Sequence, residues 1–220
     1  MATASLKPHK FFEKYLDNDL NDLFNYLSDI YDKILNENIL NVPENILKKY
    51  TQGGAATQLG MEYYNIFTFL HPGIFNLYKA LSDATREACE YYDLDFESQQ
   101  YAIHGWFNLD NATPDNSLGI SPLKNSKNFH DHSNGMGAPW FHGYYCVNAE
   151  PSSTFYQING DESNVFENIN KNNRAILSET GHPHGRDDWF QEKPRITIAY
   201  DISPLNLIRG VRPGKFIPLI

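Results

Sequence analysis

Three histidines and an arginine in the second half of the chain have the types and spacing needed for metal chemistry. His130 and His132 are separated by one residue, so on a β-strand both side chains would point to the same face. A third histidine from a later segment, His184, could supply the third protein ligand of a metal ion. Arg195, further along the chain, could hold an acidic ligand beside that metal.

Oxygen activation is the chemistry that this pattern suggests. Fe(II) oxygenases commonly hold the metal with two histidines and one carboxylate and leave open positions for other ligands. Here His130 and His132 would fill the first two places, and His184 or His182 the third. A neutral His132 in place of a carboxylate makes the site more positive, which favours an anionic co-ligand, and three imidazoles also suit Zn, Ni or Cu. A polar strand end without a metal is the simpler alternative for a His-x-His pair.

The segment 194–201 alternates in polarity as a half-buried strand does. Arg195 and Thr197 would therefore share one face, and a guanidinium beside a hydroxyl makes a carboxylate-binding site. The alternative is a surface ion pair, which an arginine at a strand edge commonly forms. The order of paired histidines, distal histidine and Arg-x-Thr strand favours the binding site. His104 and His142 lie on strand patterns of their own, and we expect them in the core or beside the ligands.

Two amphipathic helices are predicted in the first half of the chain. Apolar residues recur at helical spacing from Phe12 to Ile34, which predicts a long helix over roughly residues 9–36. A second helix follows Pro72, with Ile74, Leu77 and similar residues on one face. The aromatic stretch at 63–70 reads as a strand.

From residue 99 onward the pattern changes to short strands separated by turn signals. Predicted strands cover residues 101–108, 128–132, 140–148, 153–158, 175–179 and 195–201. Residues 111–125 read as a long loop, and 133–137 as a connecting loop or a lid over the metal. Trp106, Asn108 and Trp140 are candidates for the substrate side of the site or for core packing.

Helices followed by many short strands predict an α+β fold. We expect a double-stranded β-helix, or jelly roll, with the N-terminal helices packed outside it. The length of 220 residues, 41% of them hydrophobic, suits one domain over residues 1–220. Residues 1–98 would provide mainly helical support, and 99–203 the jelly-roll core.

The composition excludes several classes of partner. A formal net charge of -9 argues against a nucleic-acid or anionic-membrane surface. No apolar run is long enough to span a bilayer, and no secretory signal is visible at the start of the sequence. Together with the two widely spaced cysteines, Cys89 and Cys146, the lack of a visible signal predicts a cytoplasmic, intracellular protein with reduced thiols. The expected partner is a small-molecule or peptide substrate, and the oligomeric state stays open.

Five segments stand in a recognisable order along the second half of the chain. They are residues 130–132 (HDH), 143–147 (GYYCV), 174–177 (RAIL), 183–185 (PHG) and 195–201 (RITIAYD). Through them residues 101–201 resemble the 2-oxoglutarate-dependent Fe(II) oxygenases, in particular the prolyl-hydroxylase-like group. The closing Arg-x-Thr strand and its offset from His184 are the most specific part of the resemblance.

The resemblance implies a metal role for three histidines. His130 and His184 would bind iron, and His132 occupies the place of the family's Asp or Glu. His184 is preferred over His182 because the family's distal histidine is followed by a small residue and preceded by a proline-like turn.

The resemblance also implies a co-substrate site and a reaction. Arg195 would bind the distal carboxylate of 2-oxoglutarate, with Thr197 assisting and Tyr145 hydrogen bonding to the same carboxylate. The implied activity is that of an oxidoreductase: an Fe(II)- and 2-oxoglutarate-dependent dioxygenase that hydroxylates a peptidyl residue or a small molecule. The alternatives are a three-histidine, cupin-like metal dioxygenase that does not use 2-oxoglutarate, and a non-catalytic jelly-roll binding protein.

Overall fold

The computed structural model describes residues 7–51, 62–111, 129–132, 139–208 and 215–220. Its α-helices are α1 (Leu20–Glu37), α2 (Glu44–Thr51), α4 (Pro72–Tyr91) and α5 (Phe96–Gln99). Short 3₁₀ helices are η1 (Ile66–Thr68), η2 (Ile158–Gly160) and η3 (Leu205–Leu207). The strands are β1 (Phe12–Tyr15), β2 (Tyr101–Asp110), β3 (Phe141–Asn148), β4 (Ser153–Gln157), β5 (Val165–Ile169), β6 (Arg174–Glu179), β7 (His184–Arg186), β8 (Arg195–Pro204) and β9 (Ile217–Pro218).

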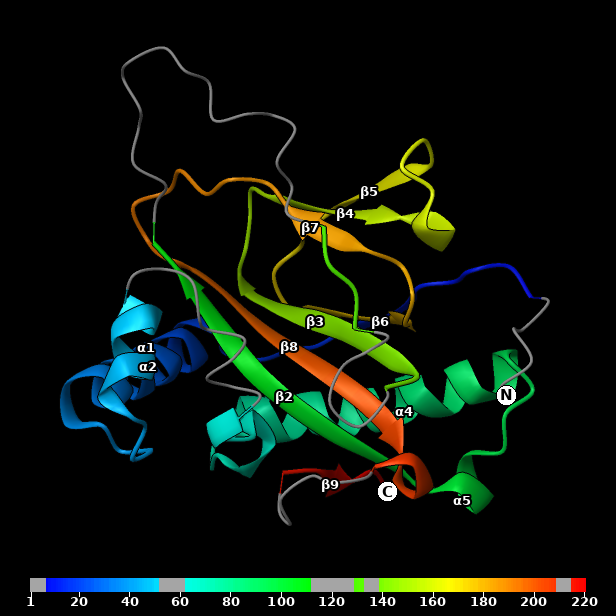
Figure 1. The fold of residues 1–220 in the computed structure, drawn as a ribbon, viewed down its shortest axis with the longest axis horizontal. Coiled ribbons are helices and arrows are strands. Elements are labelled where there is room, and N and C mark those ends of the chain that lie inside the picture. The colour runs from blue at the N-terminus through cyan, green and yellow to red at the C-terminus, as the bar shows by residue number, and fades with distance from the viewer. Residues whose placement is uncertain (1–6, 52–61, 112–128, 133–138, 209–214) are drawn as a thin grey trace.

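The strands form two antiparallel sheets. The larger has six strands in the order β1-β6-β3-β8-β2-β9, and the smaller has three in the order β5-β4-β7. A single bridge between His130 and His184 adds the segment around His130 to the edge of the smaller sheet. Figure 1 shows β4, β5 and β7 grouped above β3 and β8, with α1 and α4 beside the larger sheet. The mixed helical and antiparallel fold is confirmed, whereas a closed double-stranded β-helix stays a prediction.

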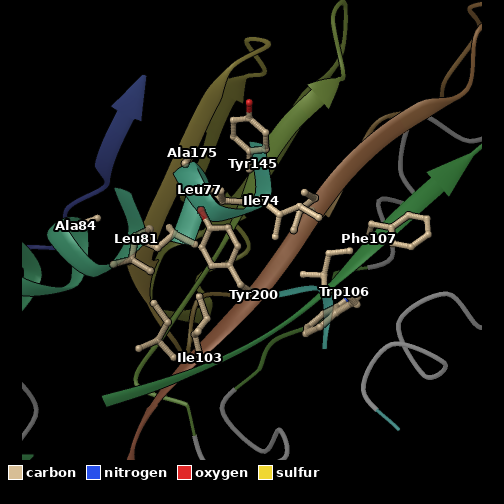
Figure 2. Packing of buried hydrophobic residues seen from close by; sticks show 14 of the residues in the cluster. Ile74, Leu77, Leu81, Ala84, Ile103, Trp106, Phe107, Tyr145, Ala175 and Tyr200 are labelled. Atoms are coloured by element: carbon tan, nitrogen blue, oxygen red, sulfur yellow. The ribbon is translucent and has the colours of Figure 1, made fainter. Parts of the chain in front are cut away.

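Alternation along β8 divides the larger sheet into two faces. Ile198 and Tyr200 belong to the hydrophobic core, together with Leu77 of α4. Figure 2 shows this packing, in which residues of α4 lie against side chains from β2 and β8. Arg195 and Thr197 point the other way, into a cavity. The predicted alternation of the segment 194–201 is therefore confirmed, and it separates a structural face from a polar face.

The long helix predicted over residues 9–36 is wrong at its start. Residues Phe12–Tyr15 form β1, which pairs with β6, and α1 begins only at Leu20. The physical reason is a cap: the Asp19 carboxylate accepts hydrogen bonds from the backbone N–H groups of Asn21 and Asp22. The apolar spacing from Phe12 onward therefore crosses a helix boundary.

The strand predicted at 63–70 is also wrong. Its centre is the 3₁₀ helix η1, which begins after Asn65. The Asn65 side chain accepts a hydrogen bond from Phe67 N at 3.2 Å and donates one to Ile103 O at 3.0 Å. These bonds satisfy backbone groups within a turn, so the segment folds back onto β2 without joining the sheet.

Other predictions have mixed outcomes. The helix after Pro72 and the strands near 101, 140, 153, 175 and 195 are confirmed, while β5, β7 and β9 were missed. The predicted lid at 133–137 and nearly all of the predicted loop at 111–125 lie outside the described residues. Within the described ranges, no helix combines the length and apolar character needed to cross a membrane.

Candidate metal centre

His130, His132 and His184 come together at one site. Each offers a ring nitrogen, and these three atoms all lie within 4.8 Å of one another. Two backbone hydrogen bonds fix the pair that forms the bridge: His130 N to His184 O at 3.1 Å and His184 N to His130 O at 2.8 Å. Metal–nitrogen bonds of about 2.1 Å allow two ligands of one ion to be up to ~4.2 Å apart, so small side-chain movements suffice.

The protonation state of His184 favours metal binding. Burial, together with the neighbouring His130 and His132, holds the pKa of His184 well below its ordinary value. The ring is therefore neutral at pH 7, which is the form that binds a metal. Three ring nitrogens this close together, one of them on a neutral ring, fit a bound metal.

His132 makes a close contact with a carboxylate from β8. Its Nδ1 atom lies 2.7 Å from Oδ1 of Asp201, and both side chains are largely buried. Burial alone would lower the pKa of His132, but the hydrogen bond and charge of Asp201, with Asp131 nearby, raise it. The spacing of the sequence motifs gave no sign of this contact.

A fourth histidine packs beneath the cluster. The His142 ring centroid lies 4.7 Å from that of His184 and 5.0 Å from that of His132, in stacked orientations. Burial and the surrounding histidines hold the pKa of His142 well below its ordinary value. His142 is thus a neutral ring that packs against two of the three clustered side chains. This position agrees with the prediction that His142 lies beside the ligands.

The three clustered histidines and Arg195 line one cavity of about 250 Å³ between the two sheets. Arg195 is 4% exposed, and its contacts with Asp110, Ser152 and Thr197 are all 3.4 Å long. Asp110 also pairs with Arg186 at 2.9 Å, so two guanidinium groups share one carboxylate. Asp187 also interacts electrostatically with both guanidinium groups. The long contacts of the buried Arg195 guanidinium favour binding of an anion here.

Tyr145 does not lie in this cavity. It belongs to the core on the opposite face of β3, beside α4 (Figure 2), and its hydroxyl contacts Asn18 and Asn173 at 3.0 and 2.5 Å. Its neighbour Tyr144 lines the cavity instead and donates a hydrogen bond to Asn170 at 2.8 Å. A shift of one residue along a strand reverses the face, and the alternation of β3 around His142 was the signal that could have identified Tyr144.

Of the three residues proposed for the substrate side, two line the cavity and one packs against the core. Trp106 and Asn108 line the cavity, and the Trp106 ring stacks on His132 with centroids 5.9 Å apart. Trp140 packs against Tyr101 of the core, at a centroid distance of 6.1 Å. His104 is buried and its Nε2 contacts the backbone oxygen of Tyr64 at 3.0 Å, so it belongs to the core.

A second group of possible ligands consists of His9, Glu179 and His182. His182 Nδ1 accepts a hydrogen bond from the backbone N–H of Asn159 at 2.8 Å, so the proton of the neutral ring must be on Nε2. That Nε2 faces Glu179 Oε1 at 3.3 Å, and His9 Nδ1 lies 3.4 Å from the same oxygen. Because Nε2 carries a proton, it has no lone pair for a metal. We interpret this group as a structural link that fixes the chain just before β7.

Comparisons with known proteins give a likeness in fold. No protein-family description matches the sequence, and no curated protein matches it either. The apo structure of ThoJ, a non-heme monooxygenase, is 11% identical with a TM-score of 0.50, over 96% of this chain and 85% of that chain. A prolyl-4-hydroxylase from Pseudomonas putida is 9% identical with a TM-score of 0.48, over 93% of this chain and 88% of that one. At such identities a likeness concerns the fold alone, and the fold of ThoJ agrees with the one implied by the sequence resemblance.

Proposed function

We propose that this protein is an Fe(II)- and 2-oxoglutarate-dependent oxygenase that hydroxylates a peptidyl residue or a small molecule. The observation that carries the proposal is the convergence of three clustered histidines and a buried arginine on one cavity. A metal ligand set beside an anion anchor is what a metal-bound keto acid with a second carboxylate requires.

His130, His132 and His184 are the residues that would hold the metal. When bound, Fe(II) would supply the activation of oxygen, which no amino-acid side chain provides. The protein contributes the neutral ring of His184 and a His132 ring oriented by the Asp201 carboxylate, and a backbone bridge holds His130 beside His184. These contacts reduce the entropy lost when the ion binds.

Arg195 and Thr197 are the residues that would bind the distal carboxylate of 2-oxoglutarate. Arg195 is buried, so its charge is weakly screened, and its side chain already lies beside the Thr197 hydroxyl. The contact of Arg195 with Asp110 is long, at 3.4 Å, because Asp110 pairs more closely with Arg186. An incoming carboxylate would replace long, weak contacts with short, charge-assisted hydrogen bonds.

The size of the cavity limits what can enter beside the co-substrate. Its volume of about 250 Å³ lies just below the range of roughly 300–1,000 Å³ that is typical of ligand pockets. Trp106 and Tyr144, both buried, form apolar wall on the β2 and β3 side. The described walls therefore suit a compact dicarboxylate and one small protruding group, such as a single side chain of a peptide.

Calorimetric titration of 2-oxoglutarate into the metal-loaded protein tests the proposal. Loss of a buried charge-assisted contact costs about 2–5 kcal/mol, so Arg195→Ala should weaken binding by at least ~30-fold. Arg86→Ala is the matched control because Arg86 forms an exposed ion pair with Glu97, and it should leave the affinity unchanged. Equal affinity of Arg195→Ala and the wild-type protein would refute the co-substrate site.

The all-histidine ligand set favours one alternative, a three-histidine metal dioxygenase that does not use 2-oxoglutarate. Oxidation of a substrate by the iron-loaded protein in the absence of 2-oxoglutarate would support that alternative. Failure of the chain to bind any metal would favour the other alternative, a non-catalytic jelly-roll binding protein.

A further inference from the structure

A row of buried polar side chains crosses the larger sheet beneath the clustered histidines. In the strand register, Asp201 of β8 lies between His104 of β2 and His142 of β3. Asp201 is 2% exposed. A buried carboxylate costs several kcal/mol unless positive charge or hydrogen-bond donors compensate for the lost water. The identity of its partner is therefore informative.

The partner of Asp201 is His132 and not either of its neighbours in the register. The ring nitrogen Nε2 of His104 faces the backbone oxygen of Tyr64, and Nε2 of His142 faces the Ser178 hydroxyl. The Asp201 carboxylate instead accepts a hydrogen bond from His132 Nδ1 over 2.7 Å.

This contact fixes the state of the His132 ring. An ionised carboxylate only accepts hydrogen bonds, so the Nδ1 atom of His132 must carry a proton. In a neutral ring the lone pair is then on Nε2, the nitrogen left to bind a metal. The same hydrogen bond also sets the direction of the ring, which is stacked against Trp106 and His142. Such carboxylate–histidine–metal arrangements orient a ligand and increase its basicity.

We propose that Asp201 is a positioning residue that supplies, through His132, the negative charge that a carboxylate ligand would otherwise bring to the metal. The proposal rests on the metal site of the proposed function. A divalent ion with three neutral imidazoles is one charge more positive than one with two imidazoles and a carboxylate. Asp201 restores that charge from the far side of one ring, and the cation in turn compensates for the burial of Asp201.

A double-mutant cycle tests this role. Co(II) affinity is measured by calorimetry for the wild-type protein and for Asp201→Asn, Asp201→Ala, His132→Ala and the double variant His132→Ala/Asp201→Asn. The isosteric Asn still accepts a hydrogen bond from Nδ1, so this variant removes only the charge. Asp29→Asn is the matched control, since it makes the same substitution in an exposed ion pair with Lys33 on α1. The free energy of unfolding of each metal-free variant is measured in urea.

Loss of such a supporting carboxylate typically costs about 10–100-fold in metal affinity. We expect a loss in this range for Asp201→Ala, a smaller loss for Asp201→Asn, and little change for Asp29→Asn. In the His132→Ala background, Asp201→Asn should change the affinity by less than ~2-fold, because its effect passes through the missing ring. A merely structural role would give the same loss in both backgrounds, and that result would overturn the proposal.

The two hypotheses fail in different ways. If the wild-type protein binds Co(II) and both Asp201 variants bind it equally well, the role of Asp201 is refuted while the metal site stands. If the wild-type protein binds no Co(II), the proposed function and the role of Asp201 are both refuted.

Discussion

Replacement of Glu179 by glutamine should destabilise the fold in a pH-dependent manner. Burial alone would raise the pKa of Glu179, but hydrogen bonds from His182 and His9 lower it to about 2, from an ordinary value of 4.5. A carboxyl group whose pKa is lower in the folded than in the unfolded chain stabilises the fold above the unfolded value. This stabilisation is lost as the pH falls from about 4.5 towards ~2.

The magnitude follows from the size of this shift. A gap of roughly 2.5 pKa units corresponds to about 3.4 kcal/mol, because each unit contributes ~1.36 kcal/mol. The Glu179 side chain is 30% exposed, and its two hydrogen bonds are 3.3 and 3.4 Å long. With solvent screening taken into account, we expect Glu179→Gln to lower the free energy of unfolding by about 1–2 kcal/mol at pH 7.

Urea unfolding of the metal-free wild-type protein and Glu179→Gln at several pH values between 7 and about 3 measures this difference. The difference should shrink below half of its neutral value by about pH 3. Glu87→Gln is the control, since Glu87 pairs with Lys14 at the surface and its loss should cost less than ~0.5 kcal/mol. A difference that is absent at pH 7, or that is the same at pH 3, would refute the assigned role of Glu179.

Three further substitutions have defined outcomes. Asp110→Asn should tighten 2-oxoglutarate binding by about 3–10-fold in calorimetry, because Asp110 competes for Arg195, and weaker binding would contradict this. Tyr145→Phe should leave the affinity for 2-oxoglutarate unchanged but lower the free energy of unfolding in urea by ~1–2 kcal/mol. A loss of that affinity would show that Tyr145 does contribute to the binding site. Gly143→Ala should lower stability by more than about 3 kcal/mol or prevent folding, as judged by circular dichroism, since the added Cβ would lie 1.8 Å from Ile176 O. A stable Gly143→Ala protein would show that β3 and β6 can separate freely.

Two pairs of site residues, His130 with His132 and Arg195 with Thr197, could be predicted because a short-range rule applies to each pair. Alternation on an extended segment orients His130 and His132 together, and it orients Arg195 and Thr197 together on β8. The choice of His184 over His182 came from family resemblance, and only His184 joins the cluster. The two pairs could be predicted because the members of each are two positions apart on an extended segment, whereas the meeting of His184 with His130 is long-range.

The contact between His132 and Asp201 could not be predicted from spacing. It joins two segments far apart in the chain, and it depends on the register of β8 with β2 and β3. Alternation did indicate the face on which Asp201 would lie, but not the ring that it would meet. Strand register is set by the packing of whole sheets, which a local pattern does not contain.

Two of the errors have local causes. Phe12 and Leu16 fit a helical period, yet a four-residue spacing also fits one face of a strand, and Asp19 was an overlooked cap. Tyr145 was assigned to the site by resemblance, although alternation with His142 favours Tyr144. In both regions a rule about neighbouring residues gave the better answer.

Anaerobic titration of the Fe(II)-loaded protein with 2-oxoglutarate tests most directly whether the three histidines and Arg195 form one metal and co-substrate site. The wild-type protein should develop a visible charge-transfer absorption that saturates at one 2-oxoglutarate per bound iron. His184→Ala should fail to retain iron, and Arg195→Ala should retain iron but require far more 2-oxoglutarate. Wild-type protein that binds iron and shows no such absorption at any 2-oxoglutarate concentration would contradict the proposed function.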